Sequence, residues 1–575
     1  MDPISLMDGD SLPVSAFAEN PDGQFELGAS AYEKRGTAVT VPTWDAEKCI
    51  QCNQCAFVCS HATIRPFMLS EDEVKAAPEN IKLADMKPKA GEYKYTMSVS
   101  PLDCMGCGEC ITVCPVGAIE MVPQESQADE QPVFDYLVAN VGKKPGMPAD
   151  NTVKCSQFNQ PLLEFSGSCA GCAETSYARL ITQLFGERMY ISNATGCSSI
   201  WGGPAATSPY TRNRISGKGP AWANSLFEDN AEHGFGMYLG QKAIRDSLAD
   251  KAKELIALGW GVASMKEAAQ AWLDTYDDGK ANAAAAEKFV AELEQAVTTL
   301  DEMIPLLESD KGKEVFGDKA DEMAANAKAR QAAGEKFCNC QACTLALSIL
   351  EKKQYLAKKS VWIFGGDGWA YDIGFGGLDH VLASGEDVNI MVFDTEVYSN
   401  TGGQASKASQ IGQVAQFAAA GKAIGKKNLA EIAMSYGYVY VAQIAMGADK
   451  NQTIKAISEA ESYHGPSLII GYAPCEMPGV KGGMTNCQNE MKRAVEAGYW
   501  NMFRFDPRKK AEGKNPFTVD SKAPTADYKA FIQSETRYSR LQRAFPERAE
   551  ELFEKAANAA KDRYEYLGKL TKLYE

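Results

Sequence analysis

The chain has 575 residues, of which 45% are hydrophobic and 23% charged, a composition typical of a soluble protein with about two to four domains. Its net charge of −16 disfavours a nucleic-acid partner, which would bind a basic face. No apolar run is long enough to span a bilayer, and the first residues lack the basic and apolar regions of an export signal, so we expect a cytoplasmic protein with no membrane partner.

The most informative residue type is cysteine. The chain contains 17 cysteines, an odd number, and no recognisable signal for export. A framework of structural disulfides is therefore disfavoured, and metal binding or redox chemistry is the better interpretation.

Five stretches follow one another along the chain. We expect residues 1–40 to be a connecting segment, residues 41–122 to form an α+β domain with two [4Fe–4S] clusters, and the polar, proline-rich residues 123–160 to be a linker. Residues 161–510 alternate short apolar strands with helical stretches, which predicts an α/β fold with a doubly wound parallel sheet. Its predicted strands are Met189–Ser192, Val361–Gly365, Asn389–Asp394, Tyr438–Gln443 and Ser467–Tyr472.

A segment within residues 161–510 and the fifth stretch both favour helices. Residues 240–335 are rich in alanine, glutamate and lysine, and we interpret them as a helical insertion into the α/β domain. Residues 511–575 are predicted to form a charged helical tail.

Eight of the cysteines lie in two runs that both follow the spacing C-x₂-C-x₂-C-x₃-C. Three closely spaced cysteines wrap around one cubane, and in two-cluster ferredoxins the fourth binds the other cluster. A zinc ribbon is the alternative, but it would use paired C-x₂-C knuckles. We therefore predict one cluster at Cys49, Cys52, Cys55 and Cys114, and another at Cys104, Cys107, Cys110 and Cys59. The long segment between the runs predicts a surface insertion over Asp72–Lys94.

A different chemistry is indicated after two of the predicted strands. The first ends in Gly365-Gly366-Asp367-Gly368, and the second is followed by a polar loop from Thr395 to Gly403. A carboxylate, a hydroxyl and a backbone carbonyl are oxygen ligands suited to Mg²⁺, and glycines allow a diphosphate to approach the backbone. Two ordinary strand-to-helix turns remain the alternative.

Four more cysteines are placed at predicted strand exits or helix starts. In a parallel sheet these positions gather at the edge where ligands bind. Such a gathering would hold a third cubane, whereas the alternative is a set of isolated buried cysteines. The four residues are Cys169, Cys172, Cys197 and Cys475.

The sequence closely resembles the pyruvate:ferredoxin (flavodoxin) oxidoreductase family. The most specific match is GGDGWAYDIGFGGLDHVLASGEDVNIMVFDTEVYSNTGGQASKAS at 365–409, and CIQCNQCAFVC, CMGCGECITVCPVGAIE, SGSCAGCAET, ATGCSS and GYAPCEM follow the order of the family. The resemblance covers nearly the whole chain and implies its C-terminal half, with a ferredoxin-type domain and a thiamine diphosphate-binding domain.

The resemblance also assigns roles to residues. It implies that the four scattered cysteines bind the cluster nearest to thiamine, that Asp367, Thr395 and the Val397 carbonyl bind Mg²⁺, and that Asn400 lies beside the reacting ring. A turn-forming asparagine is the alternative for Asn400. The implied thiamine diphosphate contacts are Glu174, Cys197, Gly366, Asp367, Gly368, Trp369, Thr395, Glu396, Val397, Tyr398, Ser399 and Asn400.

The implied reaction converts pyruvate and coenzyme A to acetyl-CoA and CO₂, with electrons leaving through three [4Fe–4S] clusters to ferredoxin or flavodoxin. Family members also have N-terminal domains that bind the pyrimidine ring, substrate and coenzyme A. We find no match to them, so we expect missing domains or a partner subunit, in a homodimer. The alternatives are an electron-transfer subunit, a related oxidoreductase for 2-oxoglutarate or indolepyruvate, and a non-redox thiamine enzyme.

Five cysteines have no place in these groups, namely Cys155, Cys338, Cys340, Cys343 and Cys487. Three of them form the run Cys338-Asn-Cys-Gln-Ala-Cys343, which suggests a metal. Because no fourth ligand is nearby in the sequence, we favour free thiols at a helix start.

Overall fold

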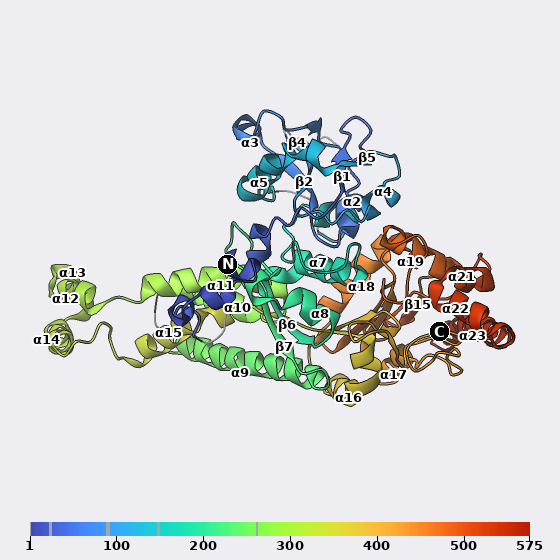
Figure 1. Cartoon of the computed structure of the whole chain (residues 1–575). Coiled ribbons are helices and arrows are strands. Elements are labelled where there is room, and N and C mark those ends of the chain that lie inside the picture. Colours follow the sequence, from blue (N-terminus) through green and yellow to red (C-terminus); the bar gives the residue numbers. More distant parts are fainter. Residues whose placement is uncertain are drawn as a thin grey trace. The chain divides into compact units, whose positions relative to one another are not determined.

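This computed structural model describes residues 2–21, 26–87, 93–145, 150–259, 261 and 263–574 (Figure 1). The chain divides into two compact units, one made of Met1–Phe235 with Val361–Glu575 and the other of Gly236–Ser360. Among the described residues, no helix combines the length and the apolar character that crossing a bilayer requires.

The first unit begins with short helical turns and a small cysteine-rich domain, drawn in blue in Figure 1. In this domain β1 pairs with β5, and β4 lies between β2 and β3, with every pair antiparallel. The core between these strands contains Trp44, Tyr95, Cys55 and Cys110. The elements are α1 (Asp2–Ser5), β1 (Thr40–Trp44), α2 (Gln54–Val58), β2 (Ile64–Leu69), α3 (Glu71–Ala76), β3 (Ala84–Asp85), β4 (Lys94–Val99), α4 (Glu109–Thr112) and β5 (Ile119–Pro123).

Two stretches of this region contain more structure than their composition suggests. The predicted linker, 123–160, holds α5 (Glu130–Asn140), which buries Val133, Phe134 and Leu137, and α6 (Val153–Ser156). The predicted surface insertion, Asp72–Lys94, holds most of α3 and all of β3, and it leads into the buried strand β4. Because these stretches contain proline and many charged residues, their sequences did not indicate the helices and strands that pack on the domain.

An eight-stranded sheet forms the rest of the first unit, in the order β15-β14-β12-β13-β9-β8-β6-β7. The pairs β12–β13, β13–β9, β9–β8 and β6–β7 are parallel, and the central strands are buried along their whole length, as expected for a sheet covered on both faces. The strands are β6 (Met189–Ala194), β7 (Ala221–Ser225), β8 (Ser360–Gly366), β9 (Asn389–Asp394), β12 (Tyr440–Ile444), β13 (Ser467–Tyr472), β14 (Phe503–Phe505) and β15 (Phe517–Val519).

The sheet agrees with the predicted α/β fold except at one edge. All five predicted strands are present, but β14 pairs antiparallel with both β12 and β15. The sheet is therefore mostly parallel, as predicted, with an antiparallel edge that the sequence did not indicate. These two strands have only three residues each, so their sequences give little periodic signal.

Helices connect the strands and complete this unit. The chain passes from β6 to the edge strand β7 and then returns to β8, so the strand order reverses between β6 and β8. The helices are α7 (Ala173–Phe185), α8 (Cys197–Gly202), α16 (Phe375–Ala383), α17 (Leu429–Met434), α18 (Lys450–Glu461), α19 (Cys487–Glu496), α20 (Arg508–Ala511), α21 (Tyr528–Ser534), α22 (Thr536–Ala544) and α23 (Pro546–Leu573).

The second unit, Gly236–Ser360, is helical and follows β7. Trp272, Phe289 and Ile349 are fully buried in its larger core, and Leu300, Ile304 and Ala327 form a smaller one. Its helices are most of α9 (Asn230–Ala257), then α10 (Ala263–Asp274), α11 (Gly279–Ala296), α12 (Leu300–Glu308), α13 (Asp310–Phe316), α14 (Lys319–Ala332) and α15 (Gln341–Glu351).

Candidate functional site: three cysteine groups and an oxygen-ligand pocket

The first cysteine group brings both runs of the small domain together. Burial raises the pKa of the Cys55 thiol, and the charges of Cys52, Cys49 and Cys114 raise it further. Only nearby sulfurs have such an effect, so Cys114 of the second run lies with the first three cysteines of the first run.

The loop of the first run is fixed by hydrogen bonds. Gln51 and Asn53 both adopt the left-handed conformation, which is uncommon outside glycine. The Asn53 side chain donates to the Lys154 carbonyl at 2.9 Å and accepts from the Tyr95 hydroxyl at 2.7 Å. These bonds stabilise a turn that aims the flanking cysteines at one centre.

The second group contains Cys59 of the first run. Burial raises the pKa of the Cys110 thiol, followed by the charges of Cys107, Cys55, Cys59 and Cys104. Cys59 of the first run therefore lies near the cysteines of the second run, and its place as their fourth cluster ligand stays a prediction from the spacing.

Backbone N–H groups donate to several of these sulfurs. Hydrogen bonds of this kind stabilise thiolates and tune the potential of a bound cluster. The N–H groups of Gln51, Thr63, Gly106 and Ala118 donate to the sulfurs of Cys49, Cys59, Cys104 and Cys114, respectively, over 3.2–3.4 Å.

A third group forms at the sheet edge from three distant segments. Burial raises the pKa of the Cys197 thiol, and the charges of Glu174, Cys475, Cys172 and Cys169 raise it further. Cys172 precedes α7, Cys197 begins α8 after β6, and Cys475 follows β13. The starts of α7 and α8 and the end of β13 therefore bring together four sulfurs from three segments that lie far apart in the sequence.

A short helical turn, η9 (Met484–Asn486), connects the second and third groups. The Thr485 hydroxyl donates to the Cys107 carbonyl, and a side chain at Gly108 would lie 3.4 Å from Thr485. On its other side, Gly171 has a φ of +75°, and an added Cβ there would lie 3.0 Å from Met484. Glycines on both cysteine loops therefore allow η9 to pack tightly between them.

Next to the third group, the ends of β8 and β9 bring three predicted oxygen ligands together. The Thr395 hydroxyl lies 2.9 Å from both the Asp367 carboxylate and the Val397 carbonyl, and 2.8 Å from the Ser399 hydroxyl. The Ser406 hydroxyl donates to the other Asp367 oxygen at 2.7 Å. The Ser399 hydroxyl can donate to Thr395, but the single Thr395 proton cannot serve both the Asp367 and the Val397 oxygens, whereas a hard cation would satisfy them together, so the donor set fits Mg²⁺.

The pocket contains several buried acidic side chains, which affect one another's pKa and that of Lys426. Burial, and then the charge of Asp394, raises the pKa of Asp367 to about 8. Burial acts to lower the pKa of Lys426, but Asp394 and Glu396 outweigh it and raise that pKa. A divalent cation would likewise favour ionised Asp367.

The glycines at the end of β8 give the loop its close packing. A Cβ at Gly368 would lie 2.5 Å from the Tyr398 ring, so a larger residue would displace the loop after β9. Trp369 is fully buried beneath Gly365. The glycines of the Gly366–Trp369 run thus place backbone without side chains at the edge where a diphosphate would bind.

Glu396, one of the predicted cofactor contacts, directs its side chain elsewhere. Its backbone is left-handed, with a φ of +65°. The Glu396 carboxylate is buried, lies 3.1 Å from Lys426 and 3.2 Å from Arg537, and accepts from the Tyr499 hydroxyl. Its side chain thus anchors the loop, which leaves its backbone for any cofactor contact.

Two further predicted residues differ in burial. Glu174 is buried and accepts from Trp201 Nε1 at 3.0 Å, and burial raises its pKa to about 7. Asn400 is exposed in a turn after β10 (Val397–Tyr398), which pairs with β11 (Gln404–Ala405). The exposed amide is thus accessible to a molecule at this edge.

Sequence reasoning missed the residues that support the pocket. Lys426, Arg537 and Thr485 each contact a predicted site residue from outside the quoted motifs, and Ser406 lies within the 365–409 match but had no assigned role. The lysine-rich run at 421–427 could have indicated such a contact, because a lysine that becomes buried in the fold requires an acidic partner. Arg537 had no local signal, since it lies in the helical tail.

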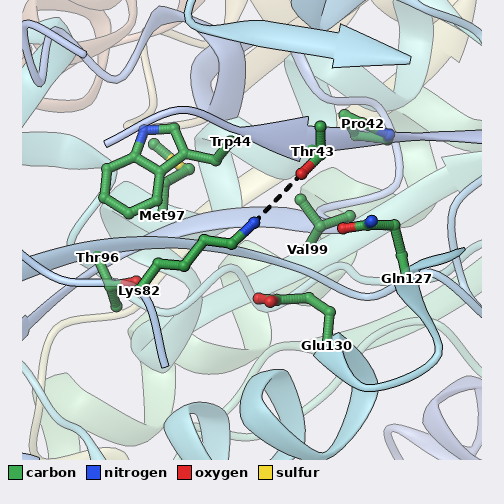
Figure 2. A pocket seen from close by; sticks show the side chains of 9 residues that line it. All are labelled: Pro42, Thr43, Trp44, Lys82, Thr96, Met97, Val99, Gln127 and Glu130. Carbon is green, nitrogen blue, oxygen red and sulfur yellow. Dashed lines mark hydrogen bonds between the residues drawn. The ribbon is translucent and has the colours of Figure 1, made fainter. Parts of the chain in front are cut away.

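A small cavity in the cysteine-rich domain is separate from these groups (Figure 2). Lys82 lies in it and donates to Thr43 at 3.3 Å, beside Glu130 and Trp44. With a volume of about 10 Å³, it has room for roughly one water molecule and for none of the cofactors considered.

Comparisons with known families agree with these groups. Residues 48–118 match a 4Fe-4S dicluster domain, and residues 321–470 match the C-terminal TPP binding domain of thiamine pyrophosphate enzymes. Residues 1–38 match a domain of unknown function.

Whole-chain relatives extend the comparison. The chain is 49% identical over 566 residues to the pyruvate-flavodoxin oxidoreductase of Klebsiella pneumoniae and 51% identical over 573 residues to that of Enterobacter agglomerans. It is 50% identical over 573 residues to the pyruvate:ferredoxin oxidoreductase of Moorella thermoacetica. The alignments cover 98–99% of this chain but only 44–45% of the relatives.

A solved 2-oxoglutarate:ferredoxin oxidoreductase from Magnetococcus marinus aligns with 32% of this chain and 63% of its own at 17% identity, but the TM-score of 0.20 is too low to support an argument. The chain is thus similar over nearly its whole length to pyruvate-flavodoxin and pyruvate:ferredoxin oxidoreductases, and it spans somewhat less than half the length of these relatives.

Proposed function

We propose that this chain is the electron-transferring, thiamine-binding part of a pyruvate:ferredoxin (flavodoxin) oxidoreductase. The reaction is pyruvate plus coenzyme A giving acetyl-CoA, CO₂, one proton and two electrons. The carbon–carbon bond to the carboxylate breaks, and the acetyl carbon forms a bond to the coenzyme A sulfur. The observation that carries the proposal is the convergence of three four-cysteine groups and an oxygen-ligand pocket within one unit.

The residues of the pocket would hold Mg²⁺ and thiamine diphosphate. Asp367, Thr395 and the Val397 carbonyl supply the oxygen ligands, while the Gly366–Trp369 backbone binds the diphosphate. Thiamine diphosphate, when bound, supplies the electron sink for decarboxylation of a 2-oxo acid. Asn400 is the candidate to hydrogen-bond the reacting group, and buried Glu174 excludes water beside the third cysteine group.

The contacts of η9 support an order for electron transfer. Thr485 and Met484 lie against the loops of the second and third cysteine groups, respectively. Cys55 and Cys110 influence each other electrostatically, which links the second group to the first. We therefore order the clusters as Cys169/Cys172/Cys197/Cys475, then Cys59/Cys104/Cys107/Cys110, then Cys49/Cys52/Cys55/Cys114, with ferredoxin or flavodoxin as acceptor.

The finer organisation is part of the same proposal. Residues 41–122 are the two-cluster domain, residues 161–510 the thiamine-binding domain with a helical insertion at about 240–335, and residues 511–575 a tail. The enzyme is a cytoplasmic homodimer in which this chain supplies the C-terminal half. Turnover requires N-terminal domains or a partner subunit, a requirement consistent with the coverage of 44–45%.

The decisive experiment is a cofactor inventory of anaerobically purified protein. We expect about twelve iron and twelve sulfide per chain, because each cubane contains four of each. With the complementary domains of a close relative supplied, we also expect thiamine diphosphate to be retained and pyruvate to bleach the iron–sulfur absorption in the presence of coenzyme A. Zinc in place of iron, or no thiamine retention in the complemented protein, would overturn the proposal.

A further inference from the structure

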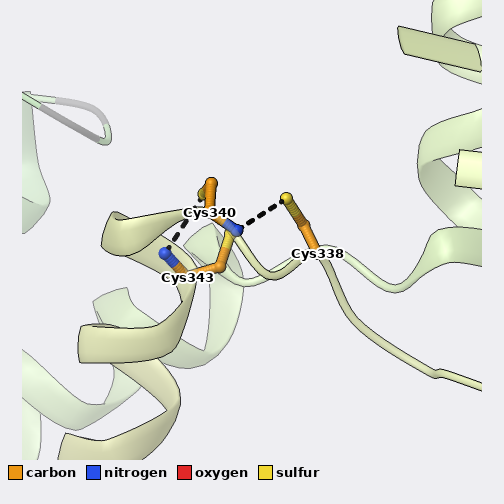
Figure 3. Close-up of side chains that lie close together, drawn as sticks. All are labelled: Cys338, Cys340 and Cys343. Atoms are coloured by element: carbon orange, nitrogen blue, oxygen red, sulfur yellow. Dashed lines mark hydrogen bonds between the residues drawn. The ribbon is translucent and has the colours of Figure 1, made fainter. Parts of the chain in front are cut away.

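A second type of thiol site lies in the helical unit, outside the three groups above (Figure 3). The sulfurs of Cys338, Cys340 and Cys343 all lie within 4.8 Å of one another. They converge where the loop after α14 enters α15 (Gln341–Glu351), and Cys340 is the N-cap residue of that helix. The run of cysteines in the sequence thus becomes a compact set of three thiols.

The surrounding backbone favours thiolates at this position. The Cys340 N–H donates to the Cys338 sulfur, and the Cys343 N–H donates to the Cys340 sulfur, both over 3.4 Å. Both bonds belong to the start of an eleven-residue helix, whose N-terminus stabilises negative charge.

The loop that carries Cys338 is held in place by Arg330 of α14. Its guanidinium donates to the Asn339 side chain at 2.5 Å, to the Phe337 carbonyl at 3.1 Å, and to the Glu335 carboxylate. These hydrogen bonds therefore hold the loop that carries the thiols in a fixed position.

We propose that Cys338, Cys340 and Cys343 bind one thiophilic d¹⁰ metal ion, such as Zn²⁺, with the fourth position open to water. Thiolates bound at about 2.3 Å to one tetrahedral ion stand roughly 3.8 Å apart, so the observed sulfurs need only small side-chain rotations. Among the described residues, the group has no fourth protein ligand. That absence favoured free thiols in the sequence, but open zinc sites need only three protein ligands.

The exposures of the three cysteines fit an open site. Cys343 is buried, Cys338 is partly buried and Cys340 is exposed. The ion would sit at the surface and tie the end of the loop to the first turn of α15. The proposal is independent of the reaction proposed above, because none of these residues belongs to the thiamine or iron–sulfur sites.

The test uses the anaerobically purified protein with its clusters in place. One equivalent of Zn²⁺ is added, excess is removed by gel filtration, and zinc and iron per chain are measured together. We expect one zinc per chain, and X-ray absorption at the zinc edge should give three sulfur neighbours at about 2.3 Å and one lighter atom. Iron does not contribute at that edge, so the two metals are read separately.

Variants Cys338→Ser and Cys340→Ser should weaken zinc binding at least about tenfold in competition with a chelator, since even outer-shell losses cost that much. Cys155→Ser is the matched control and should retain zinc, because Cys155 lies outside the group. Unchanged iron and thermal unfolding in the variants exclude misfolding. Equal zinc retention in a variant that carries both substitutions, a zinc shell of nitrogen and oxygen alone, or a disulfide within the group would each overturn the proposal.

Discussion

The two regions that carry the proposed iron–sulfur clusters assemble their cysteine groups by different means. In the cysteine-rich domain, three members of each group come from a single loop, and one cysteine from the other run completes it. At the sheet edge, only Cys169 and Cys172 are close in sequence, while Cys197 and Cys475 arrive from the ends of β6 and β13. The first region relies on local turns, whereas the second relies on the register of a whole sheet.

This difference has consequences for robustness. A local loop keeps its three cysteines near one another even if the surrounding domain loosens, because few residues separate them. The sheet-edge group depends on long-range packing that must be complete before the sulfurs meet. We therefore expect the third group, and the oxygen-ligand pocket beside it, to be the more sensitive to substitution.

The largest expected effect is loss of an entire cluster in Cys475→Ser. Iron per chain should fall by about four, because one cubane loses one of its four cysteine ligands. The matched variant Cys55→Ser should also remove about four, but from the cysteine-rich domain. Iron analysis with electron paramagnetic resonance of the reduced protein distinguishes the two losses. If Cys475→Ser emptied all three groups, the two regions would not be independent.

The next effect concerns the pocket at the ends of β8 and β9. Asp367→Ala removes a buried carboxylate that lies 2.9 Å from Thr395, so retention of thiamine diphosphate in the complemented protein should fall at least about tenfold. Iron content should be unchanged. Asp387→Asn is the control, because this residue precedes the opposite end of β9. Equal retention in Asp367→Ala and the control would remove Asp367 from the magnesium site.

A third effect tests the support behind that pocket. Arg537→Met breaks the buried pair with Glu396, and such a loss costs about 3 kcal/mol, near the lower end of the usual range because Lys426 remains. The thermal unfolding midpoint should fall, and thiamine retention should fall with it. Arg540→Met, at an exposed position of the same helix, should leave both unchanged. A midpoint that did not move would show that Lys426 alone holds Glu396.

The same contrast explains what the sequence could predict. Local spacing was sufficient to predict a two-cluster domain, which the match of residues 48–118 to a 4Fe-4S dicluster domain supports, because a cubane loop is defined by nearby residues. The strands β9 and β13 also matched their predictions at both ends, since continuous apolar runs mark buried strands. The antiparallel edge strands and α5 gave no comparable signal.

The supporting side chains could not be predicted for a physical reason. Arg537 reaches Glu396 only because the tail packs on the sheet, and Ser406 reaches Asp367 only because the loop after β10 folds back. Neither contact leaves a periodic pattern in the sequence. The direction of the Glu396 side chain is another example, since it depends on a single left-handed residue in the loop.

The smallest expected effect lies at η9, where the two iron–sulfur regions meet. Thr485→Val keeps the size of the side chain but removes its hydrogen bond to the Cys107 carbonyl, a change worth about 1 kcal/mol. We expect unchanged iron and thiamine content but slower reduction of the two-cluster domain by pyruvate in rapid-freeze measurements. Thr518→Val, in the edge strand β15, is the control. A rate equal to that of the control would mean that electron transfer between the two regions does not depend on this contact. In that case η9 would serve only to hold the locally assembled cysteine groups against the one assembled by the sheet.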